Sequence, residues 1–444
     1  MGQRFGTDGI RGIANVELTA DLAVALGRAV GLRHGADGDG VLVGRDTRRS
    51  GDMLVAAISA GLTSVGVDAH LLGVVPTPAV AFTVAEGSSA AGIMVSASHN
   101  PATDNGLKVI AAGGRKLDDA AEAELEALMA VAADRTGPGN DGLGIVLDAS
   151  DRIAGYRDSR LGIAGAIDAR GLRIVVDGAN GSGCRLGPMI LGATGASVTA
   201  IHDTPDGRNI NFACGATAPG SLADAVRAAG ADLGFALDGD ADRLIAVDVA
   251  GRVVDGDQVI GILALDGIAR GTLPRGAVVV SVLSNGGLVR AVEAAGGTVL
   301  RTPVGDRHIA DAMEATGAGL GGEKSGHVIV RARADTGDGI LTALELLRVM
   351  AATGRDLATL AAAVPLLPQE QRAVPARRAA SWAEEPAIRA AVAEAERHLG
   401  PGGRVLVRPS GTEPALRVMV EGDDATTVAR AADAIAAVAA ERLD

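Results

Sequence analysis

Apolar and polar positions follow one block pattern that occurs three times along this chain. Each block is a continuous apolar run, a polar or glycine-rich turn, an alanine-rich segment, a glycine and a second apolar run. Continuous apolar runs predict strands buried on both faces, and the alanine-rich segments predict helices that connect them. The pattern therefore predicts an α/β protein with three similar, mostly parallel layers. The blocks begin at Val41, Leu172 and Ala277, and their second strands are expected near residues 67–72, 197–201 and 298–301.

Clusters of glycine and proline divide the chain into four predicted domains. Residues 137–144 read G-P-G-N-D-G-L-G, residues 250–256 form a predicted turn, and residues 364–375 contain three prolines. Beyond the prolines, strands and helices follow in a different order, which predicts a small α+β domain. We predict three similar mixed α/β sandwich domains at residues 1–137, 145–250 and 251–364, and a C-terminal α+β domain at residues 369–444.

Composition and charge narrow the classes of partner. Hydrophobic residues make up 48% of the 444 residues, which indicates a folded, globular chain. Aromatic residues make up only 1%, and the net charge is −13. Few stacking platforms and an acidic balance argue against nucleic acid and against anionic membranes. The same negative charge does not favour a phosphorylated substrate, so any phosphate site must concentrate its cations locally.

The cysteines and the apolar segments bear on the cellular compartment. Cys184 and Cys214 lack the spacing of a zinc site or a disulfide framework, which is typical of a reducing cytosol. No charge-free apolar stretch is long enough to span a membrane, and the first residues lack the apolar region of a signal peptide. We therefore expect a cytoplasmic protein.

A candidate nucleophile stands in the segment V-S-A-S-H-N-P at residues 95–101. The apolar run before it predicts a strand that ends by presenting Ser98 at a tight, exposed loop. Ten residues later comes Lys108, one of only three lysines in the chain. Lysine where arginine serves elsewhere indicates a group that must give up a proton. The bare pattern is equally typical of a strand that ends in an Asn-Pro turn with serine caps.

Three carboxylates alternate in the segment L-D-G-D-A-D-R, at Asp238, Asp240 and Asp242. Packed carboxylates repel one another unless a cation lies among them, and hard oxygen ligands suit Mg²⁺. A calcium EF-hand loop is excluded, because Arg243 stands where that loop needs glycine and Val249 where it needs glutamate. A solvated acidic turn remains the alternative interpretation.

Two further segments carry candidate binding residues. The segment G-E-K-S-G-H at residues 322–327 offers polar groups that suit sugar hydroxyls, although an ordinary glycine-rich loop has the same composition. The segment R-P-S-G-T-E-P-A-L-R at residues 408–417 offers backbone N–H groups, hydroxyls and two arginines that suit an anion. A Pro-Gly turn between two strands is the alternative for this second segment.

Together with F-G-T-D-G-I-R-G at residues 5–12, these segments resemble the motifs of the α-D-phosphohexomutases over nearly the whole chain. Members of that family move a phosphoryl group between the 1- and 6-positions of a sugar, and have four domains around a central cleft. Finer segments look like the phosphoglucosamine mutase branch, among them N-I-N-F-A-C-G at residues 209–215 and V-G-D-R-H-I at residues 304–309. Two departures from that branch are C-G-A-T-A at residues 214–218 and Lys324, where the branch commonly has glutamine.

The resemblance implies a role for each candidate residue. Ser98 would carry the phosphoryl group, and Lys108 or His327 would act as general base and acid with help from Arg11 and His99. Glu323 and Ser325 would hold the sugar ring. The resemblance further implies one Mg²⁺ per subunit, held by Ser98, Asp238, Asp240 and Asp242, and a phosphate loop made of Arg408, Ser410, Gly411, Thr412 and Arg417.

The implied reaction interconverts glucosamine 6-phosphate and glucosamine 1-phosphate through a phosphoserine and a bound glucosamine 1,6-bisphosphate, which also serves as activator. It would feed the synthesis of UDP-N-acetylglucosamine and of the cell wall. A phosphomannomutase/phosphoglucomutase, a non-catalytic phosphosugar-binding relative and a phosphate-stripping hydrolase are the alternatives. A neighbouring ammonium would oppose a charged amine, so we predict that Lys324 points away from the sugar. The oligomeric state stays open, with a homodimer as one possibility, as do regulation and the source of the first phosphoryl group.

Overall fold

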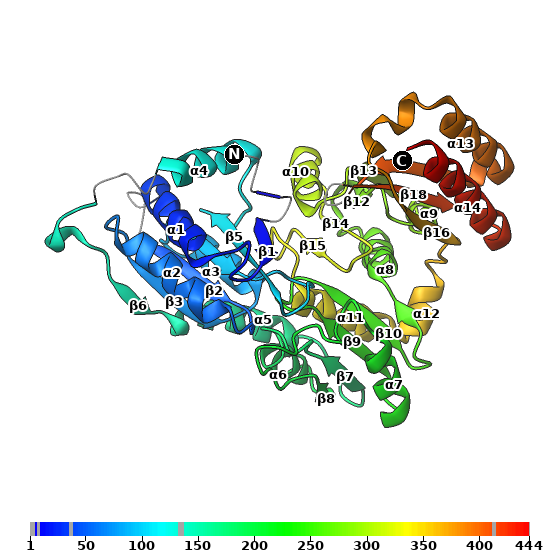
Figure 1. Cartoon of the computed structure of the whole chain (residues 1–444). Helices are drawn as coiled ribbons and strands as arrows, with labels where there is room; N and C mark the ends of the chain where they lie inside the picture. Colours follow the sequence, from blue (N-terminus) through cyan, green and yellow to red (C-terminus); the bar gives the residue numbers. More distant parts are fainter. Residues whose placement is uncertain (1–4, 7–8, 35–38, 132–136, 411–413, 444) are drawn as a thin grey trace. The chain divides into compact units, whose positions relative to one another are not determined.

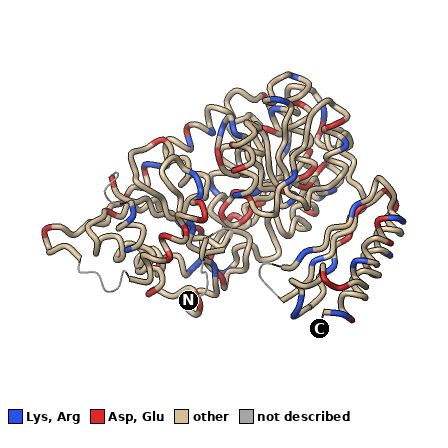
Figure 2. Tube along the Cα trace, turned by 90° about the horizontal axis from the view of Figure 1, so that it is seen from above, with Lys and Arg blue, Asp and Glu red and all other residues tan. Residues whose placement is uncertain are grey.

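The computed structural model describes the chain apart from residues 1–4, 7–8, 35–38, 132–136, 411–413 and 444. The described residues form two compact units (Figure 1). The larger unit comprises Met1–Val282 and Ala295–Ala363, and the smaller unit comprises Leu283–Ala294 and Val364–Asp444. Acidic and basic residues are interspersed along the trace (Figure 2). In the described part of the chain, no helix combines the length and the apolar character needed to cross a bilayer.

The first sheet of the larger unit has six strands in the order β1-β5-β4-β2-β3-β6. Its centre is parallel, because β2 pairs in parallel with both β3 and β4, whereas β5 pairs antiparallel with β4 and β1. The strands are β1 (Ile10–Ile13), β2 (Val41–Arg45), β3 (Ala69–Val74), β4 (Ala91–Val95), β5 (Asp104–Ala111) and β6 (Val146–Asp148). The accompanying helices are α1 (Ala20–His34), α2 (Gly51–Thr63), α3 (Thr77–Glu86) and α4 (Asp119–Val131).

Both faces of the central strands β2, β4 and β5 are buried, as the continuous apolar runs predicted. Val41 and Val43 of β2 belong to the hydrophobic core that includes α1 and α2, whereas Leu42 belongs to the core that includes α3.

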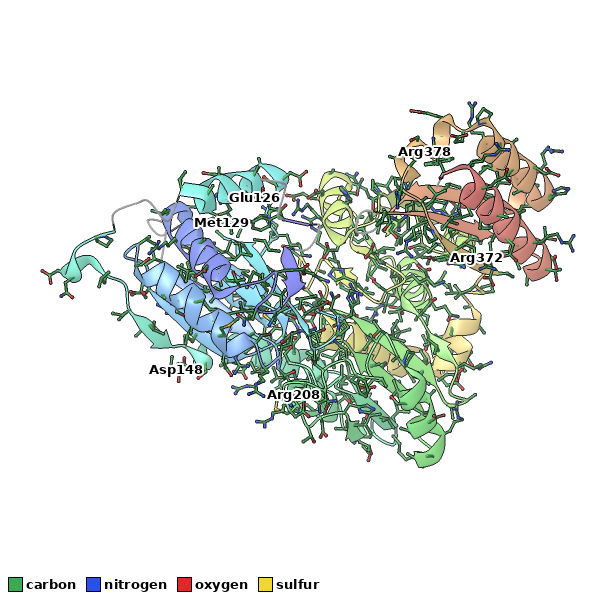
Figure 3. All side chains as sticks on the ribbon, viewed as in Figure 1. Glu126, Met129, Asp148, Arg208, Arg372 and Arg378 are labelled. Atoms are coloured by element: carbon green, nitrogen blue, oxygen red, sulfur yellow. The ribbon has the colours of Figure 1, made fainter. Side chains whose placement is uncertain are left out.

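Helices α1 and α2 approach closely at two glycines. A Cβ on Gly27 would lie 2.3 Å from the carbonyl oxygen of Ile58, and one on Gly61 would lie 2.4 Å from that of Val24. Glu126 of α4 accepts a hydrogen bond from the backbone N of Phe5 (2.7 Å; Figure 3).

The second sheet has five strands in the order β11-β10-β9-β7-β8. Strand β7 pairs in parallel with β8 and β9, and β9 and β10 form an antiparallel hairpin. The strands are β7 (Arg173–Asp177), β8 (Ser197–Ile201), β9 (Leu233–Leu237), β10 (Leu244–Asp248) and β11 (Val253–Val254). The helices of this region are α5 (Ala154–Gly165), α6 (Leu186–Gly192) and α7 (Gly220–Ala229).

The third sheet has four strands in the order β13-β12-β14-β15. Strand β12 pairs in parallel with β13 and β14, and β15 closes the sheet antiparallel to β14. The strands are β12 (Ala277–Ser281), β13 (Thr298–Thr302), β14 (Leu320–Gly322) and β15 (Val328–Val330). The helices are α8 (Gly256–Ala269), α10 (Asp306–Thr316), α11 (Gly339–Thr353) and α12 (Leu357–Ala362).

The smaller unit contains an antiparallel sheet in the order β16-β18-β17. Its strands are β16 (Gln369–Pro375), β17 (Arg404–Pro409) and β18 (Ala415–Glu421), and its helices are α9 (Gly286–Ala294), α13 (Pro386–Leu399) and α14 (Ala425–Arg442). Helix α9 is held within this unit by an ion pair between Arg290 and Asp423 (2.6 Å) and by two hydrogen bonds of Asn285 with the backbone of Leu367. Leu416, Val428 and Ile435 lie in its core.

The predicted fold class is confirmed. Each repeated block is a pair of parallel strands with a helix between them in the chain, namely β2 and β3, β7 and β8, and β12 and β13. Ser98, the three aspartates and Glu323 follow the carboxyl ends of β4, β9 and β14, which pair in parallel with β2, β7 and β12.

Candidate active site

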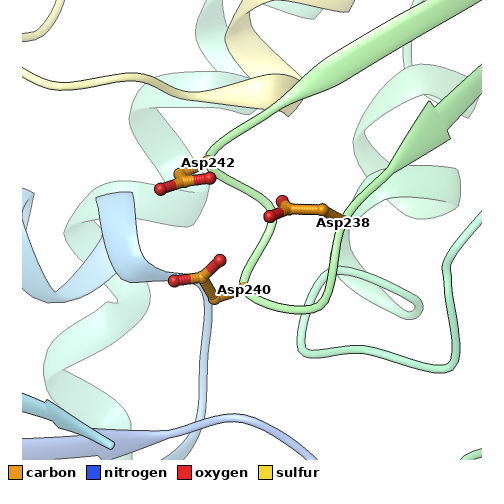
Figure 4. Close-up of side chains that lie close together, drawn as sticks. All are labelled: Asp238, Asp240 and Asp242. Atoms are coloured by element: carbon orange, nitrogen blue, oxygen red, sulfur yellow. The ribbon is translucent and has the colours of Figure 1, made fainter. Parts of the chain in front are cut away.

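Three buried aspartates lie together in the loop between β9 and β10 (Figure 4). The antiparallel pair Leu237 and Leu244 closes the hairpin on either side of this loop. Asp238 and Asp240 are fully buried, and Asp242 is 4% exposed. One carboxylate oxygen of each lies within 4.8 Å of those of the other two. The alternating spacing therefore places three carboxylates around one point, as the sequence predicted.

The charge balance of the loop favours a cation. Burial raises the pKa of Asp238 well above its usual range, and the nearby charges of Asp242 and Asp240 raise it further. Lys108 Nζ lies 2.9 Å from Asp240 Oδ2 and 3.8 Å from Asp242 Oδ2, and Arg243 Nε lies 3.8 Å from Asp242 Oδ1. Asp242 Oδ1 is buried and has no hydrogen-bond partner among the described residues. These acceptors are hard oxygen ligands, so the triad can bind a divalent metal ion.

Ser98 lies directly against the aspartates. Its Oγ donates a hydrogen bond to Asp238 Oδ2 (2.5 Å), and its backbone N donates to Ser96 Oγ (2.9 Å). Its backbone is left-handed, with φ 51°. The prediction of an exposed serine is wrong, because Ser98 is fully buried. The loop of the second sheet covers it so closely that a Cβ on Gly239 would lie 2.5 Å from the carbonyl oxygen of Ser98.

The other candidates of the first sheet lie around Ser98 and the triad. Lys108 lies on β5 opposite Met94 of β4, and its ammonium group reaches Asp240. Arg11 on β1 donates from Nη1 to Asn100 Oδ1 (3.3 Å), two residues after Ser98. His99 Nδ1 lies 3.5 Å from Ser98 Oγ. Burial, aided by the charges of Arg243 and Arg11, lowers the pKa of His99 to about 4, so its ring is neutral near pH 7.

His327 reaches the site from the turn between β14 and β15. It is buried, and its backbone forms an isolated antiparallel bridge with Arg243 of the triad loop. Its Nε2 lies 3.6 Å from Asp306 Oδ2, and neither ring nitrogen has a hydrogen-bond partner in the described part of the chain. The ring is thus in a position to exchange a proton, and its catalytic role stays a prediction.

The turn that includes Glu323 and Ser325 packs on the second sheet. Leu244 N donates to Gly326 O (3.0 Å), and Gly256 N donates to Lys324 O (3.1 Å). Glu323 Oε1 accepts from Gly305 N (3.3 Å), whereas Lys324 Nζ lies 3.9 Å from Asp255 Oδ2. The buried Ser325 Oγ has no hydrogen-bond partner among the described residues. The Lys324 and Glu323 side chains thus have different polar neighbours.

The predicted phosphate loop belongs to the smaller unit. Arg408 of β17 pairs directly with Arg417 of β18, and Ser410 N donates to Ala415 O (2.8 Å). Burial and the charge of Arg417 lower the pKa of Arg408. Like charges opposite each other in a sheet are unfavourable, so this pair suits an anion. Gly411 and Thr412 lie outside the described residues, and the role of the loop in substrate binding stays a prediction.

Two residues of the site were missed by sequence reasoning. Arg243 stands in the triad segment itself, and its backbone N donates to Asp238 Oδ1 (3.3 Å), so its position beside the aspartates was the available signal. Thr77 begins α3, and its Oγ1 donates to Asp240 Oδ2 (2.5 Å) while its N donates to Asp240 O (2.9 Å). Nothing in the local sequence of Thr77 indicates this contact.

Family models of phosphoglucomutase/phosphomannomutase match the chain in four consecutive segments. The α/β/α domains I, II and III match residues 2–135, 154–251 and 255–366, and the C-terminal domain matches residues 371–438. The boundaries predicted from glycine and proline clusters stay predictions. The chain belongs to the phosphoglucomutase/phosphomannomutase family, whose members are α-D-phosphohexomutases.

Several curated relatives with high identity to this chain are phosphoglucosamine mutases. The phosphoglucosamine mutase of Moorella thermoacetica is 49% identical over 427 residues, which is 96% of each chain. That of Symbiobacterium thermophilum is 48% identical and aligned over 99% of each chain. Among solved structures, a phosphoglucomutase/phosphomannomutase family protein from Burkholderia thailandensis superposes with a TM-score of 0.83 at 28% identity, covering 100% of this chain and 98% of that one.

Proposed function

We propose that this chain is a magnesium-dependent phosphoglucosamine mutase, which interconverts glucosamine 6-phosphate and glucosamine 1-phosphate through a phosphorylated Ser98. The observation that carries the proposal is the 2.5 Å contact between Ser98 Oγ and Asp238 inside the buried aspartate triad. The similarity to curated phosphoglucosamine mutases over 96–99% of the chain supports the choice of substrate.

The reaction is two phosphoryl transfers of opposite direction. In the first, the bond between phosphorus and Ser98 Oγ breaks, a bond to the free sugar hydroxyl forms, and the hydroxyl proton passes to a general base. Glucosamine 1,6-bisphosphate is the bound intermediate. After it reorients, its other phosphoryl group passes to Ser98 Oγ, and the departing sugar oxygen takes a proton. Positioning and electrostatics supply most of the rate enhancement in such transfers.

The buried aspartates supply the metal site. Asp238, Asp240 and Asp242, with an oxygen on Ser98, would hold one Mg²⁺ per subunit, which supplies positive charge beside the transferring group. Arg243 adds fixed positive charge at the same place, and Lys108 adds positive charge while it is protonated, since their nitrogens lie within 4.0 Å of the carboxylates. The net charge of −13 is therefore offset locally by cations where an anionic substrate reacts.

Proton transfer is assigned to Lys108 and His327. Lys108 is close to the triad, and His327 has ring nitrogens that are not committed to hydrogen bonds among the described residues. Arg11 stabilises the loop after Ser98 through Asn100, and the neutral His99 orders the same loop. Glu323 and Ser325 would bind ring hydroxyls, and Arg408, Ser410, Gly411, Thr412 and Arg417 the non-reacting phosphate.

A mutase is favoured over a hydrolase by the similarity to curated phosphoglucosamine mutases. Ser98 has no exposed surface, and the loop of the second sheet covers it. This burial limits the access of water and of a sugar hydroxyl alike, so the choice between the two reactions rests on the similarity.

Intact-mass analysis and a side-by-side assay test the proposal. A fraction of the purified chains should be heavier by one phosphoryl group, mapped to Ser98, and Ser98→Ala should lose both this mass and the turnover. Ser96→Ala is the control for the mapping, because Ser96 lies two residues away and is equally buried. Full turnover by Ser98→Ala would contradict the assignment.

The side-by-side assay also determines which sugar phosphate the enzyme prefers. With a trace of 1,6-bisphosphate, kcat/KM should favour glucosamine phosphate over glucose phosphate by at least about tenfold, or roughly 1.4 kcal/mol. An equal preference would indicate a phosphomannomutase/phosphoglucomutase. Release of inorganic phosphate would indicate a hydrolase, and binding without turnover a non-catalytic relative.

A further inference from the structure

Two side chains from different parts of the larger unit hold the backbone of the nucleophile. The carbonyl oxygen of Ser98 accepts hydrogen bonds from Arg48 Nη2 (3.0 Å) and Asn211 Nδ2 (2.8 Å). The carbonyl oxygen of Asn100 accepts from the same two nitrogens, at 2.8 Å and 3.0 Å. A guanidinium and a carboxamide thus bridge the same pair of carbonyls.

Arg48 extends this contact along the whole loop. It is fully buried, and its Nη1 donates to the carbonyl oxygens of Pro101 and of Asp104 (3.0 Å). Its Nε lies 2.9 Å from Asp46 Oδ2, which also accepts from Ser96 Oγ (2.6 Å). Ser96 Oγ in turn accepts from Ser98 N. The buried Arg48 guanidinium is therefore paired with Asp46, and its other N–H groups donate hydrogen bonds to backbone carbonyls of residues 98–104.

Asn211 brings the second sheet region to the same carbonyls. It lies in the N-I-N-F-A-C-G segment after β8, it is half-buried, and its backbone N donates to Ala179 O (2.9 Å). Both Ser98 and Asn211 have left-handed backbones, with φ 51° and 57°. A serine rarely adopts this conformation without tertiary contacts that hold it.

We propose that Arg48 and Asn211 are positioning residues for the nucleophile. By fixing the carbonyls of Ser98 and Asn100, they hold Ser98 in its left-handed conformation and keep Oγ aimed at the aspartate triad. No contact with the sugar or with the transferring group is assigned to either side chain. This inference rests on the proposed phosphoserine mechanism.

Asn211→Gly is the decisive variant. Glycine tolerates the positive φ and removes only the carboxamide, so the change deletes the hydrogen bonds without backbone strain. We expect kcat to fall about tenfold or more with KM within about twofold, because small misplacements of reacting atoms cost rate and leave binding intact. The rate at which Ser98 accepts phosphoryl from a hexose 1,6-bisphosphate, followed by intact mass, should fall with kcat.

Asn15→Gly is the matched control. Asn15 also has a positive φ (60°) and is exposed, and its substitution should change neither kcat nor the phosphorylation rate. Arg48→Lys is the second variant, because lysine keeps the charge beside Asp46 and cannot bridge several carbonyls. It should lower kcat more than Asn211→Gly does.

Hydrogen exchange provides a readout that does not depend on turnover. In Asn211→Gly, the amides of residues 98–100 and 102–104 should exchange faster than in the wild type, with an unfolding temperature lowered by at most a few degrees. A folded Asn211→Gly protein with wild-type exchange and wild-type phosphorylation rate would overturn the inference. So would a loss confined to KM, or an equal loss in Asn15→Gly. Absence of phosphate from Ser98 in the wild type would instead refute the proposed function, and the exchange comparison would still test the contact.

Discussion

At the scale of single residues, the site is a compromise between burial and charge. Three aspartates and a lysine lie within a few ångströms of one another with at most 5% of any of these side chains exposed. Such a group is costly to bury unless every charge has a partner. The pKa of Asp238 is raised chiefly by burial and further by the charges of Asp242 and Asp240, and the charge of Arg243 opposes this rise. A bound cation relieves this repulsion.

Asp240→Asn should weaken the binding of Mg²⁺ by about tenfold or more, because a neutral oxygen replaces a charged one among few ligands. Isothermal titration of the variant with MgCl₂ measures the change without relying on turnover. Chelator should likewise abolish activity in the wild type, and Mg²⁺ should restore it.

Asp248→Asn is the control for this titration. Asp248 is buried at the opposite end of the same hairpin and pairs with Arg252 (2.7 Å), so its charge does not reach the triad. Equal Mg²⁺ affinity in wild type and Asp240→Asn would mean that the aspartate loop is structural.

At the scale of elements, close helix packing supports the sheet that carries Ser98. Helices α1 and α2 contact each other through Gly27 and Gly61, where a side chain would meet backbone atoms of the opposite helix. Both helices pack on the face of the first sheet that includes Ile93 and Val95 of β4. The strand that leads to Ser98 is therefore positioned by a layer that allows no extra methyl group at these points.

Gly61→Ala should lower the unfolding temperature, with a destabilisation of about 1–3 kcal/mol, because the new Cβ would lie 2.4 Å from the carbonyl oxygen of Val24. Thermal unfolding followed by circular dichroism measures the shift.

Gly162→Ala is the matched control, in the middle of α5. A Cβ at Gly162 meets nothing within 4 Å, so this change should stabilise by about 0.5–1 kcal/mol through helix propensity alone. Shifts of the same sign in the two variants would contradict the packing argument.

At the scale of the whole molecule, the candidate residues are divided between the two compact units. The larger unit carries the nucleophile, the aspartate triad and the sugar turn, and the smaller unit carries the paired arginines Arg408 and Arg417.

Arg417→Ala should raise KM with little change in kcat. A contact with the non-reacting phosphate acts equally on the ground and transition states, and charge-assisted hydrogen bonds contribute about 1.5–3 kcal/mol, or roughly 10- to 150-fold in KM. Steady-state kinetics with the sugar phosphate as variable substrate measures the effect.

Arg372→Ala is the control from the same sheet (Figure 3). Arg372 on β16 pairs with Asp433 (2.8 Å) and Glu370 (2.6 Å), and its loss should leave KM unchanged. An unchanged KM in Arg417→Ala would refute the placement of the phosphate on that arginine.

The sequence by itself determined the fold class and the local chemistry. A strand that is apolar at every position is buried on both faces, and such strands are typical of parallel sheets. The pattern therefore predicted the parallel strand pairs. The alternation in D-G-D-A-D placed three carboxylates on one short loop, because residues only two positions apart in the chain cannot lie far from one another. That Lys324 points away from the sugar stays a prediction; its ammonium lies 3.9 Å from Asp255 Oδ2.

Only the tertiary structure decided which distant residues meet. The contact of Thr77 with Asp240 joins positions 163 residues apart, and that of Asn211 with Ser98 joins positions 113 residues apart. No local pattern encodes such contacts, because they depend on how separate sheets pack. The same packing explains why Ser98 is buried although its own segment predicted an exposed turn, since the covering loop comes from another sheet. Local sequence thus specifies which groups are available, and packing between sheets decides which of them share a site.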